Sequence, residues 1–240
     1  MIRLNKFLSQ AGVASRREAD RWILEGRVKV NGSIIKVLGH KICDQSDDVK
    51  VDGKHIKKTT QHVYLMLNKP KGVLVTLKDP QNRPTVKSLI GPVRQRVFPV
   101  GRLDLNSEGL LLLMDDGELA YRLMHPRYQI DKEYQVRVKG QPEESSLERL
   151  REGIYLDGRK TAPARVVMLN AGTKKCLLNI GIHEGRKREI RRMIEAIGHT
   201  PTALKRVRFA GLTLGGLKPG QWRRLRSDEV AQLKKRVNLD

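Results

Sequence analysis

The stretch GRLDLNSEG at residues 101–109, which runs directly into the apolar run LLLLM at 110–114, is the part of the sequence around which the rest can be arranged. The residue to explain is Asp104, a short acidic side chain between a predicted strand at 96–103 and a loop that ends in glycine. Folds often present catalytic groups on loops that are held between rigid elements. An Asx turn or an ordinary surface acid fits the same spacing equally well, so spacing alone makes Asp104 a candidate and no more.

The charge balance of the chain indicates a polyanionic partner. Its 240 residues include 48 Lys and Arg against 26 Asp and Glu, a net charge of +22, and residues 1–60 alone carry 13 basic and 7 acidic side chains. Such an excess is typical of proteins that neutralise phosphates. Aromatic residues make up only 4% and the basic residues are spread along the chain, which argues against a membrane-surface helix. We therefore expect nucleic-acid binding that depends on phosphate contacts.

Signals for several other classes of protein are missing from the sequence. The N-terminus carries no apolar signal segment, and no apolar run approaches the ~20 residues that a membrane span requires. Cys43 and Cys176 stand far apart and neither has a CxxC partner, so we expect neither a disulfide framework nor a zinc site. The sequence also lacks an extended heptad pattern, which would have suggested an oligomer. These observations favour a soluble, reduced, cytoplasmic monomer that contacts no membrane and holds no metal.

The first sixty residues are predicted to form a small unit of helices and β-hairpins. Ser15 and Glu18 form a capping box for a helix at 16–25, which ends at Gly26. Alternating apolar residues and two Asx-Gly turns then predict two hairpins. A polar segment at 57–61 is the predicted linker.

Arg16 and Arg17 lie in the first turn of this helix, where the helix dipole disfavours positive charge. A reason other than local helix stability is therefore needed for their position. We interpret them as phosphate contacts, and an ordinary solvated helix face is the alternative.

Residues 61–240 are predicted to form one larger unit, with a core at 63–226 and a short basic tail. Strands and helices mix without strict alternation, which predicts an α+β domain on a mixed, largely antiparallel sheet flanked by helices. Lys69 lies in a Lys-Pro-Lys-Gly loop that is either a plain turn or a loop that faces phosphate. Strands are expected at 63–67, 73–76, 96–103, 132–138, 164–169, 176–182, 204–210 and 221–225, and helices at 86–90, 118–124, 143–152 and from about 190 to 197.

The most basic segment is GRKREIRRM at 185–193, and it contains the start of an amphipathic helix that Gly198 ends. At about 100° per residue, Arg191 lies just beside the apolar stripe, whereas Arg188 and Arg192 point away from it. Arg191 can therefore reach a partly buried acid while its neighbours reach phosphates. An Arg at such a position also often just extends its charged end into water, and geometry leaves both possibilities open.

Familiar motifs of metal, nucleotide-cofactor and serine-nucleophile chemistry are absent, because the sequence has no HExxH, GxGxxG, P-loop or GxSxG pattern. An acid among basic helices remains. A carboxylate is ionised at neutral pH, and a paired Arg keeps it ionised where burial would neutralise it. Such a group can act on a glycosidic carbon as a nucleophile or as a base, and it needs no cofactor.

Several segments match known signatures in order along the chain. LNKFL at 4–8, AGVASRREA at 11–19 and GRVKVNG at 26–32 closely resemble an S4 RNA-binding domain. GRLD at 101–104 with SEGLLLL at 107–113, KEY at 132–134 and the segment at 185–193 resemble the RsuA/RluB branch of ribosomal RNA pseudouridine synthases. The likeness extends from residue 3 to about 225 and places an S4-like domain at 1–60 before a synthase domain at 61–240.

The resemblance implies an isomerase that converts uridine to pseudouridine in ribosomal RNA without a cofactor. Asp104 would be the catalytic aspartate, Tyr134 would pack on the target base, and Arg191 would pair with Asp104, while Arg102 would help to hold the nucleotide. The uridine would be flipped out of the RNA, detached at N1, turned and rejoined to ribose through C5. Further RNA contacts are expected from Arg16, Arg17, Lys69, Arg186, Lys187, Arg188 and Arg192.

Local details of segments 123–126, 138–140 and 188–192 look more like the members of this branch that act on the large ribosomal subunit than like the small-subunit enzyme. We therefore expect large-subunit ribosomal RNA as the substrate, with the same activity on small-subunit RNA as an alternative. A noncatalytic S4-type assembly factor is a second alternative. A glycosidase that uses Asp104 with Glu108 or Asp115 is a third, which the basic surface disfavours.

Overall fold

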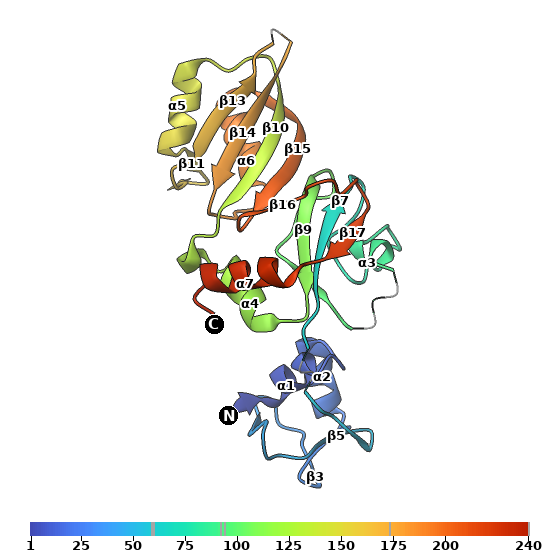
Figure 1. Cartoon of the computed structure of the whole chain (residues 1–240). Coiled ribbons are helices and arrows are strands. Elements are labelled where there is room, and N and C mark those ends of the chain that lie inside the picture. The colour runs from blue at the N-terminus through green and yellow to red at the C-terminus, as the bar shows by residue number, and fades with distance from the viewer. Residues whose placement is uncertain (59–60, 92, 94, 173, 240) are drawn as a thin grey trace. The chain divides into compact units, whose positions relative to one another are not determined.

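Two units divide the chain in the computed structural model, which describes residues 1–58, 61–91, 93, 95–172 and 174–239 (Figure 1). The smaller unit consists of residues 1–63 with the short segments 93–97 and 114–117, and the larger unit contains the remainder. The predicted linker at 57–61 includes residues 59 and 60, which lie outside the described residues.

The smaller unit encloses its own core between two helices and a small sheet. The predicted capping box is present at the start of α2, where Ser15 Oγ accepts from Glu18 N at 3.1 Å and Glu18 Oε2 accepts from Ser15 N at 3.3 Å. Ala19 and Ile23 of the same helix are buried in the core. Both predicted hairpins form, and they join in a sheet with the order β3-β2-β5-β6. The elements are β1 (Ile2–Arg3), α1 (Leu4–Gln10), α2 (Arg16–Leu24), β2 (Val28–Val30), β3 (Ser33–Ile34), β4 (Lys41–Ile42), β5 (Val49–Val51) and β6 (Lys54–His55).

The larger unit is built on one mixed sheet with the order β13-β14-β10-β15-β9-β7-β17, extended by β16 beside β15 and β8 beside β9. Among the strand pairs whose register is described, β15 with β9 is parallel and the others are antiparallel. This mixed, largely antiparallel sheet confirms the predicted α+β class. Helix α5 packs against β13 and helix α6 against β15 (Figure 1). The first half contains β7 (Tyr64–Lys69), α3 (Val86–Leu89), β8 (Phe98–Val100), β9 (Glu108–Met114), α4 (Gly117–Met124), a short 3-10 helix (Pro126–Tyr128), β10 (Lys132–Lys139) and α5 (Glu144–Glu152). The second half contains β11 (Tyr155–Leu156), β12 (Arg159–Lys160), β13 (Arg165–Asn170), β14 (Lys175–Ile182), α6 (Glu189–Ala196), β15 (Thr200–Phe209), β16 (Leu212–Thr213), β17 (Trp222–Arg224) and α7 (Ser227–Arg236).

Two predicted strands differ from the structure. The segment 73–76 forms no strand, because Leu74 pairs with the turn before α3 through the bonds Leu74 N to Pro84 O and Val86 N to Leu74 O. The strand expected at 96–103 is limited to β8, since the backbone turns at Gly101 with a φ of 72°. The residues from 101 to 107 are therefore a loop, with Asp104 in its middle.

The parallel contact between β9 and β15 depends on Gly109. The register pairs Gly109 with Arg206, and the φ of Gly109 is 107°, a conformation that side chains rarely adopt. A Cβ at this position would collide with the backbone of Arg206. Glycine is therefore required where the strand that follows the Asp104 loop meets the strand that carries Arg206.

Replacement of Gly109 by Ala should destabilise the protein by at least about 2 kcal/mol, because it adds both backbone strain and a collision with a neighbouring strand. Thermal or urea unfolding measures the effect. Gly216→Ala is the matched control, since a Cβ at Gly216 meets no atom within 4 Å. Equal stability of the two variants would contradict this account of the strand contact.

Candidate active site

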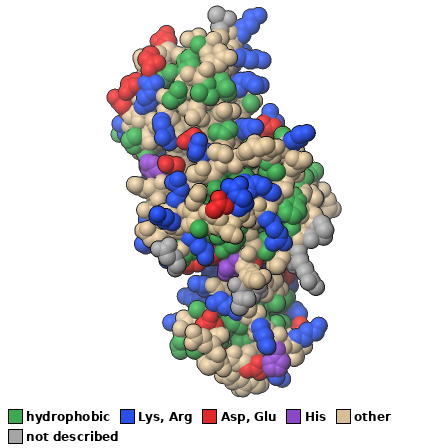
Figure 2. All heavy atoms as spheres, viewed as in Figure 1, with side chains coloured by type: hydrophobic (Ala, Val, Ile, Leu, Met, Phe, Trp, Pro, Cys, Tyr) green, Lys and Arg blue, Asp and Glu red, His purple; other side chains and the backbone are tan. Residues whose placement is uncertain are grey.

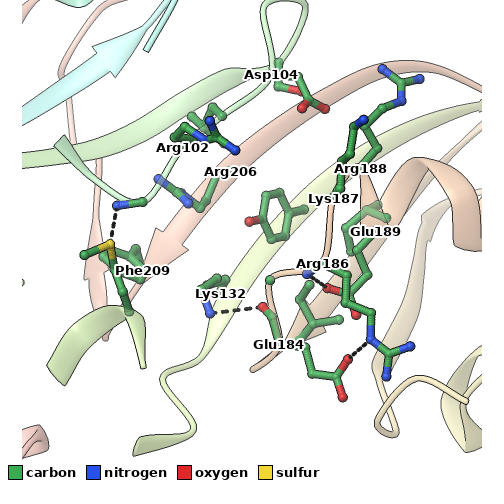
Figure 3. Close-up of a pocket in the computed structure, with 18 of the residues that line it drawn as sticks. Arg102, Asp104, Lys132, Glu184, Arg186, Lys187, Arg188, Glu189, Arg206 and Phe209 are labelled. Atoms are coloured by element: carbon green, nitrogen blue, oxygen red, sulfur yellow. Dashed lines mark hydrogen bonds and ion pairs between the residues drawn. The ribbon is translucent and has the colours of Figure 1, made fainter. Parts of the chain in front are cut away.

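A cavity of about 920 Å³ opens in the larger unit beside the Asp104 loop (Figure 3). Its wall includes residues 99–104 and 107, residues of strands β10 and β15, and the segment 182–190. Asp104, Tyr134 and Arg102 are among the residues that line it. Segments that are far apart in the sequence therefore meet at one place, and they bring one predicted acid together with several predicted cations.

Asp104 and Arg191 form an ion pair in which Arg191 Nε lies 3.7 Å from Asp104 Oδ2. The side chain of Arg191 is only 9% exposed, whereas that of Asp104 is 36% exposed. Arg191 Nη2 also donates to Asn106 O at 3.1 Å and to Ser107 Oγ at 3.3 Å. Burial and the nearby Arg188 lower the pKa of Arg191, and the charge of Asp104 opposes that shift. The buried guanidinium thus holds the loop while the acid remains open to the cavity.

Lys69 also supports the Asp104 loop, and it does so as a buried residue and not as the phosphate contact predicted from the sequence. Its side chain is completely buried, and its Nζ donates to the carbonyls of Pro70 at 2.9 Å, Leu105 at 3.2 Å and Ser107 at 2.8 Å. Burial lowers the pKa of Lys69 to about 8, which leaves the ammonium group mostly protonated at neutral pH. The expected phosphate contact is therefore replaced by a structural role, because all three donors of Lys69 serve the protein backbone.

Tyr134 and Lys132 lie on the same face of β10, two residues apart, and both line the cavity. Tyr134 is 8% exposed. Lys132 Nζ donates at 3.1 Å to the carbonyls of Ile130, His183 and Glu184, and burial lowers its pKa to about 8. Lys132 therefore ties the segment that precedes α6 to the strand that carries Tyr134.

The rim of the cavity is basic. Arg102, Lys187 and Arg188 line it and are exposed, and within the described residues none of the three side chains has a hydrogen bond or an ion pair. Figure 2 shows Lys and Arg side chains scattered over the visible face rather than gathered in one stripe. These three cations are free to meet a phosphate backbone that approaches Asp104.

Other predicted contacts are placed differently. The guanidinium of Arg186 donates to the backbone carbonyls of residues 159 and 160 and lies 2.8 Å from Glu184 Oε2, so its donors serve the protein. Arg192 does not line the cavity, and its Nη2 lies 2.5 Å from Asp157 Oδ1. Arg16 and Arg17 are exposed at the start of α2 in the smaller unit.

Glu189 is a buried acid at the first residue of α6 and lines the cavity. Its Oε2 accepts from Arg186 N at 2.9 Å. Burial raises the pKa of Glu189 to about 7, and the neighbouring Glu184 carboxyl adds to that shift. Near neutral pH this position therefore changes between a neutral acid and a carboxylate.

The described residues contain no group of three or more His, Cys, Asp or Glu side chains placed to hold a metal ion. None of the described helices is both long enough and apolar enough to cross a lipid bilayer.

Comparison with known proteins identifies the larger unit. The family described as RNA pseudouridylate synthase matches residues 63–196, and the S4 domain matches residues 2–49. The chain belongs to the RNA pseudouridylate synthase family. It is an isomerase, and the resemblance of its sequence to pseudouridine synthases is confirmed.

Full-length relatives of this synthase share both parts. An "Uncharacterized RNA pseudouridine synthase" of Aquifex aeolicus is 47% identical over 99% of this chain and 96% of its own length. The "Ribosomal large subunit pseudouridine synthase B" of Bacillus subtilis is 45% identical over 98% of this chain and 96% of its own length. A solved pseudouridylate synthase is 30% identical with a TM-score of 0.71, and the match covers 97% of this chain and 100% of that one.

Two cations of this synthase were not singled out from the sequence. Lys132 belongs to the KEY triplet at 132–134, and it lies on the same face of its strand as Tyr134. Arg206 lies on the same face of β15 as buried Leu204 and is itself only 3% exposed. A charged residue in phase with the apolar positions of a strand is the signal that could have identified both.

Glu189→Gln should make the stability of the synthase less dependent on pH. The folded-state pKa of about 7 lies above the usual value of 4.5, so the wild type is stabilised below pH 4.5 and loses that contribution as the pH rises through 7. The variant should therefore gain roughly 2–3 kcal/mol relative to the wild type between pH 5 and pH 8. Urea unfolding at both pH values measures the difference, and a constant difference would contradict the raised pKa.

Proposed function

We propose that this synthase isomerises a uridine of large-subunit ribosomal RNA, with Asp104 as its catalytic carboxylate. The observation that carries the proposal is the Asp104–Arg191 ion pair at a cavity with a basic rim. Relatives from Bacillus subtilis and Pseudomonas aeruginosa are both named ribosomal large subunit pseudouridine synthase B, which supports the choice of RNA.

Asp104, Tyr134 and the exposed cations at the rim of the cavity each have a place in this reaction. The target uridine is flipped out of the RNA and packs on the ring of Tyr134, while Arg102, Lys187 and Arg188 receive its phosphates. The N1–C1′ bond breaks, the ring turns, and a C5–C1′ bond forms. C5 loses its proton and N1 gains one, so the reaction is an isomerisation without net oxidation. Asp104 can serve as a nucleophile at C1′ or as a base at the 2′ carbon.

Asp104→Asn should abolish pseudouridine formation on ribosomal RNA while it leaves most of the RNA affinity, because the amide keeps the shape but removes the charged acid. Pseudouridine mapping and filter binding measure the two properties. Glu108→Gln is the control, since Glu108 does not line the cavity, and it should retain activity. Product from the Asp104 variant would remove this residue from the mechanism, and loss of product with Glu108→Gln would show that the reaction needs a second carboxylate.

The choice of subunit and the rival assembly role are tested in cells that lack this protein. Under the proposal, one or more pseudouridines disappear from large-subunit ribosomal RNA and small-subunit RNA is unchanged. A loss from small-subunit RNA would reassign the substrate. An unchanged set of pseudouridines, with defective ribosome assembly, would favour the noncatalytic RNA-binding factor.

We further propose that residues 1–60 act as a domain that recruits RNA for the synthase domain at 61–240, and that the protein works as a monomer. Support comes from the S4 match at 2–49 and from exposed Arg16 and Arg17. A capping box already satisfies the start of α2, so the two cations are not needed to form that helix. Light scattering with and without RNA tests the monomer.

Arg16→Gln with Arg17→Gln should weaken RNA binding and lower the slope of log affinity against log salt by about one for each phosphate that is no longer neutralised. The matched control, Arg21→Gln with Arg27→Gln, removes the same charge from the same unit, but those residues are paired with Glu25 and Asp52. Equal slopes for the two double variants would mean that overall charge, and not this helix start, binds the RNA.

A further inference from the structure

Arg206 is a buried charge of the cavity that has no role in the proposed reaction. It lies on β15, lines the cavity and is 3% exposed (Figure 3). Its Nε donates to Leu110 O at 2.7 Å, whereas its Nη2 is buried and has no hydrogen-bond partner. Across the described part of the chain, Arg206 forms no ion pair with a carboxylate. Most of its donors are therefore left for a molecule that enters the cavity.

A buried cation without a counter-ion is costly to the folded state, and here a second cation makes the situation worse. Lys132 also lines the cavity, and after burial the charge of Arg206 is the next cause that lowers the pKa of Lys132. Lys132 has three carbonyl partners, but Arg206 has one. The uncompensated charge is thus concentrated on the guanidinium, which favours an electron-rich ligand.

The sheet places this guanidinium beside Tyr134. Arg206 and Tyr134 are directly opposite each other in the antiparallel pair of β15 with β10, so their side chains leave the same face of the sheet about 5 Å apart. The guanidinium carbon lies 5.0 Å from the ring centre of Phe209, a contact that limits its movement. A base that packs on Tyr134 therefore presents its edge to a positioned cation.

We propose that Arg206 donates a hydrogen bond to a carbonyl oxygen of the flipped uracil and stabilises the negative charge that the ring carries after it leaves the sugar. This inference rests on the proposed position of the base on Tyr134. When the N1–C1′ bond breaks, its electron pair stays with the uracil and is shared among N1, O2 and O4. The charge disappears when C5 bonds to C1′, C5 releases its proton and N1 takes one up. A fixed donor aimed at such developing charge is an effective form of catalysis.

A purely structural role makes the opposite prediction about stability. If Arg206 only fastens β9 to β15 through Leu110, its removal should weaken the fold. If it serves the uracil, removal of an unpaired buried charge should leave stability unchanged or raise it. The two roles can therefore be separated by measuring unfolding alongside activity.

The first experiment compares Arg206→Met and Arg206→Gln with the wild type on the ribosomal RNA that the wild type modifies. We expect kcat to fall about 100-fold or more, KM to change little, and the melting temperature to be maintained. Arg208→Met is the matched control, because Arg208 lies on the same strand but is 45% exposed and faces Glu133, and it should keep full activity. Unchanged kcat, or a loss of activity that follows a loss of stability, would overturn the proposal.

The second experiment changes the substrate. RNA with 2-thiouridine or 4-thiouridine at the target site replaces one carbonyl oxygen by sulfur, a weaker acceptor. One of the two should slow the wild type and have little further effect on Arg206→Gln, which identifies the oxygen. The proposal would be overturned if both thio substitutions slowed Arg206→Gln as much as they slow the wild type. It would also be overturned if Arg206→Gln changed only KM on every RNA, as expected for a phosphate contact. If the wild type modifies no ribosomal RNA, both the proposed function and this inference fail together, whereas active wild type with unaffected Arg206 variants defeats the inference alone.

Discussion

The most consequential interaction in this synthase is the convergence of three backbone carbonyls on the ammonium group of Lys69. A loop has few backbone partners of its own, and its conformation has to be fixed from outside. Lys69 does this from the end of β7, where its buried Nζ donates to Pro70, Leu105 and Ser107. Arg191 adds a second fixed point from α6. Asp104 can therefore remain partly exposed without losing its position.

Backbone carbonyls, more than carboxylates, hold the buried and half-buried cations around the cavity. Lys69 and Lys132 each have three carbonyl acceptors, and Arg186 has two in addition to Glu184. Carbonyls satisfy the donors without cancelling the charge, so the site is rigid and yet strongly positive. A polyanion is then attracted to the cavity in which Asp104 lies among these cations. Arg206 departs from this pattern, because it has one carbonyl acceptor and its buried Nη2 has no hydrogen-bond partner.

Sequence reasoning worked where one periodic pattern decides the outcome. The helical phase of Arg191 correctly indicated that it could reach a partly buried acid, and the Ser15–Glu18 pair located the start of α2. Sequence patterns were less reliable where contacts between distant segments determine the structure. Lys69 reads as part of an exposed turn because nothing nearby in the sequence shows that residues 105–107 will enclose it. The segment 73–76 has the composition of a strand, but the sheet provides it with no partner strand.

The Asp104–Arg191 pair joins two parts of the chain that are made at different times. The hydrogen bond of Arg191 to Asn106 spans 85 positions, and α6 and β15 follow the acid by most of a domain. A chain still emerging from the ribosome can fold β9 and expose its acid before any of the cations at 186–206 exist. Long-range contacts of this kind form late in folding. During synthesis the acid therefore has Lys69 to hold its loop but lacks its partner Arg191 until α6 has been made, so a nascent or truncated chain has no complete site with which to alter the RNA around it.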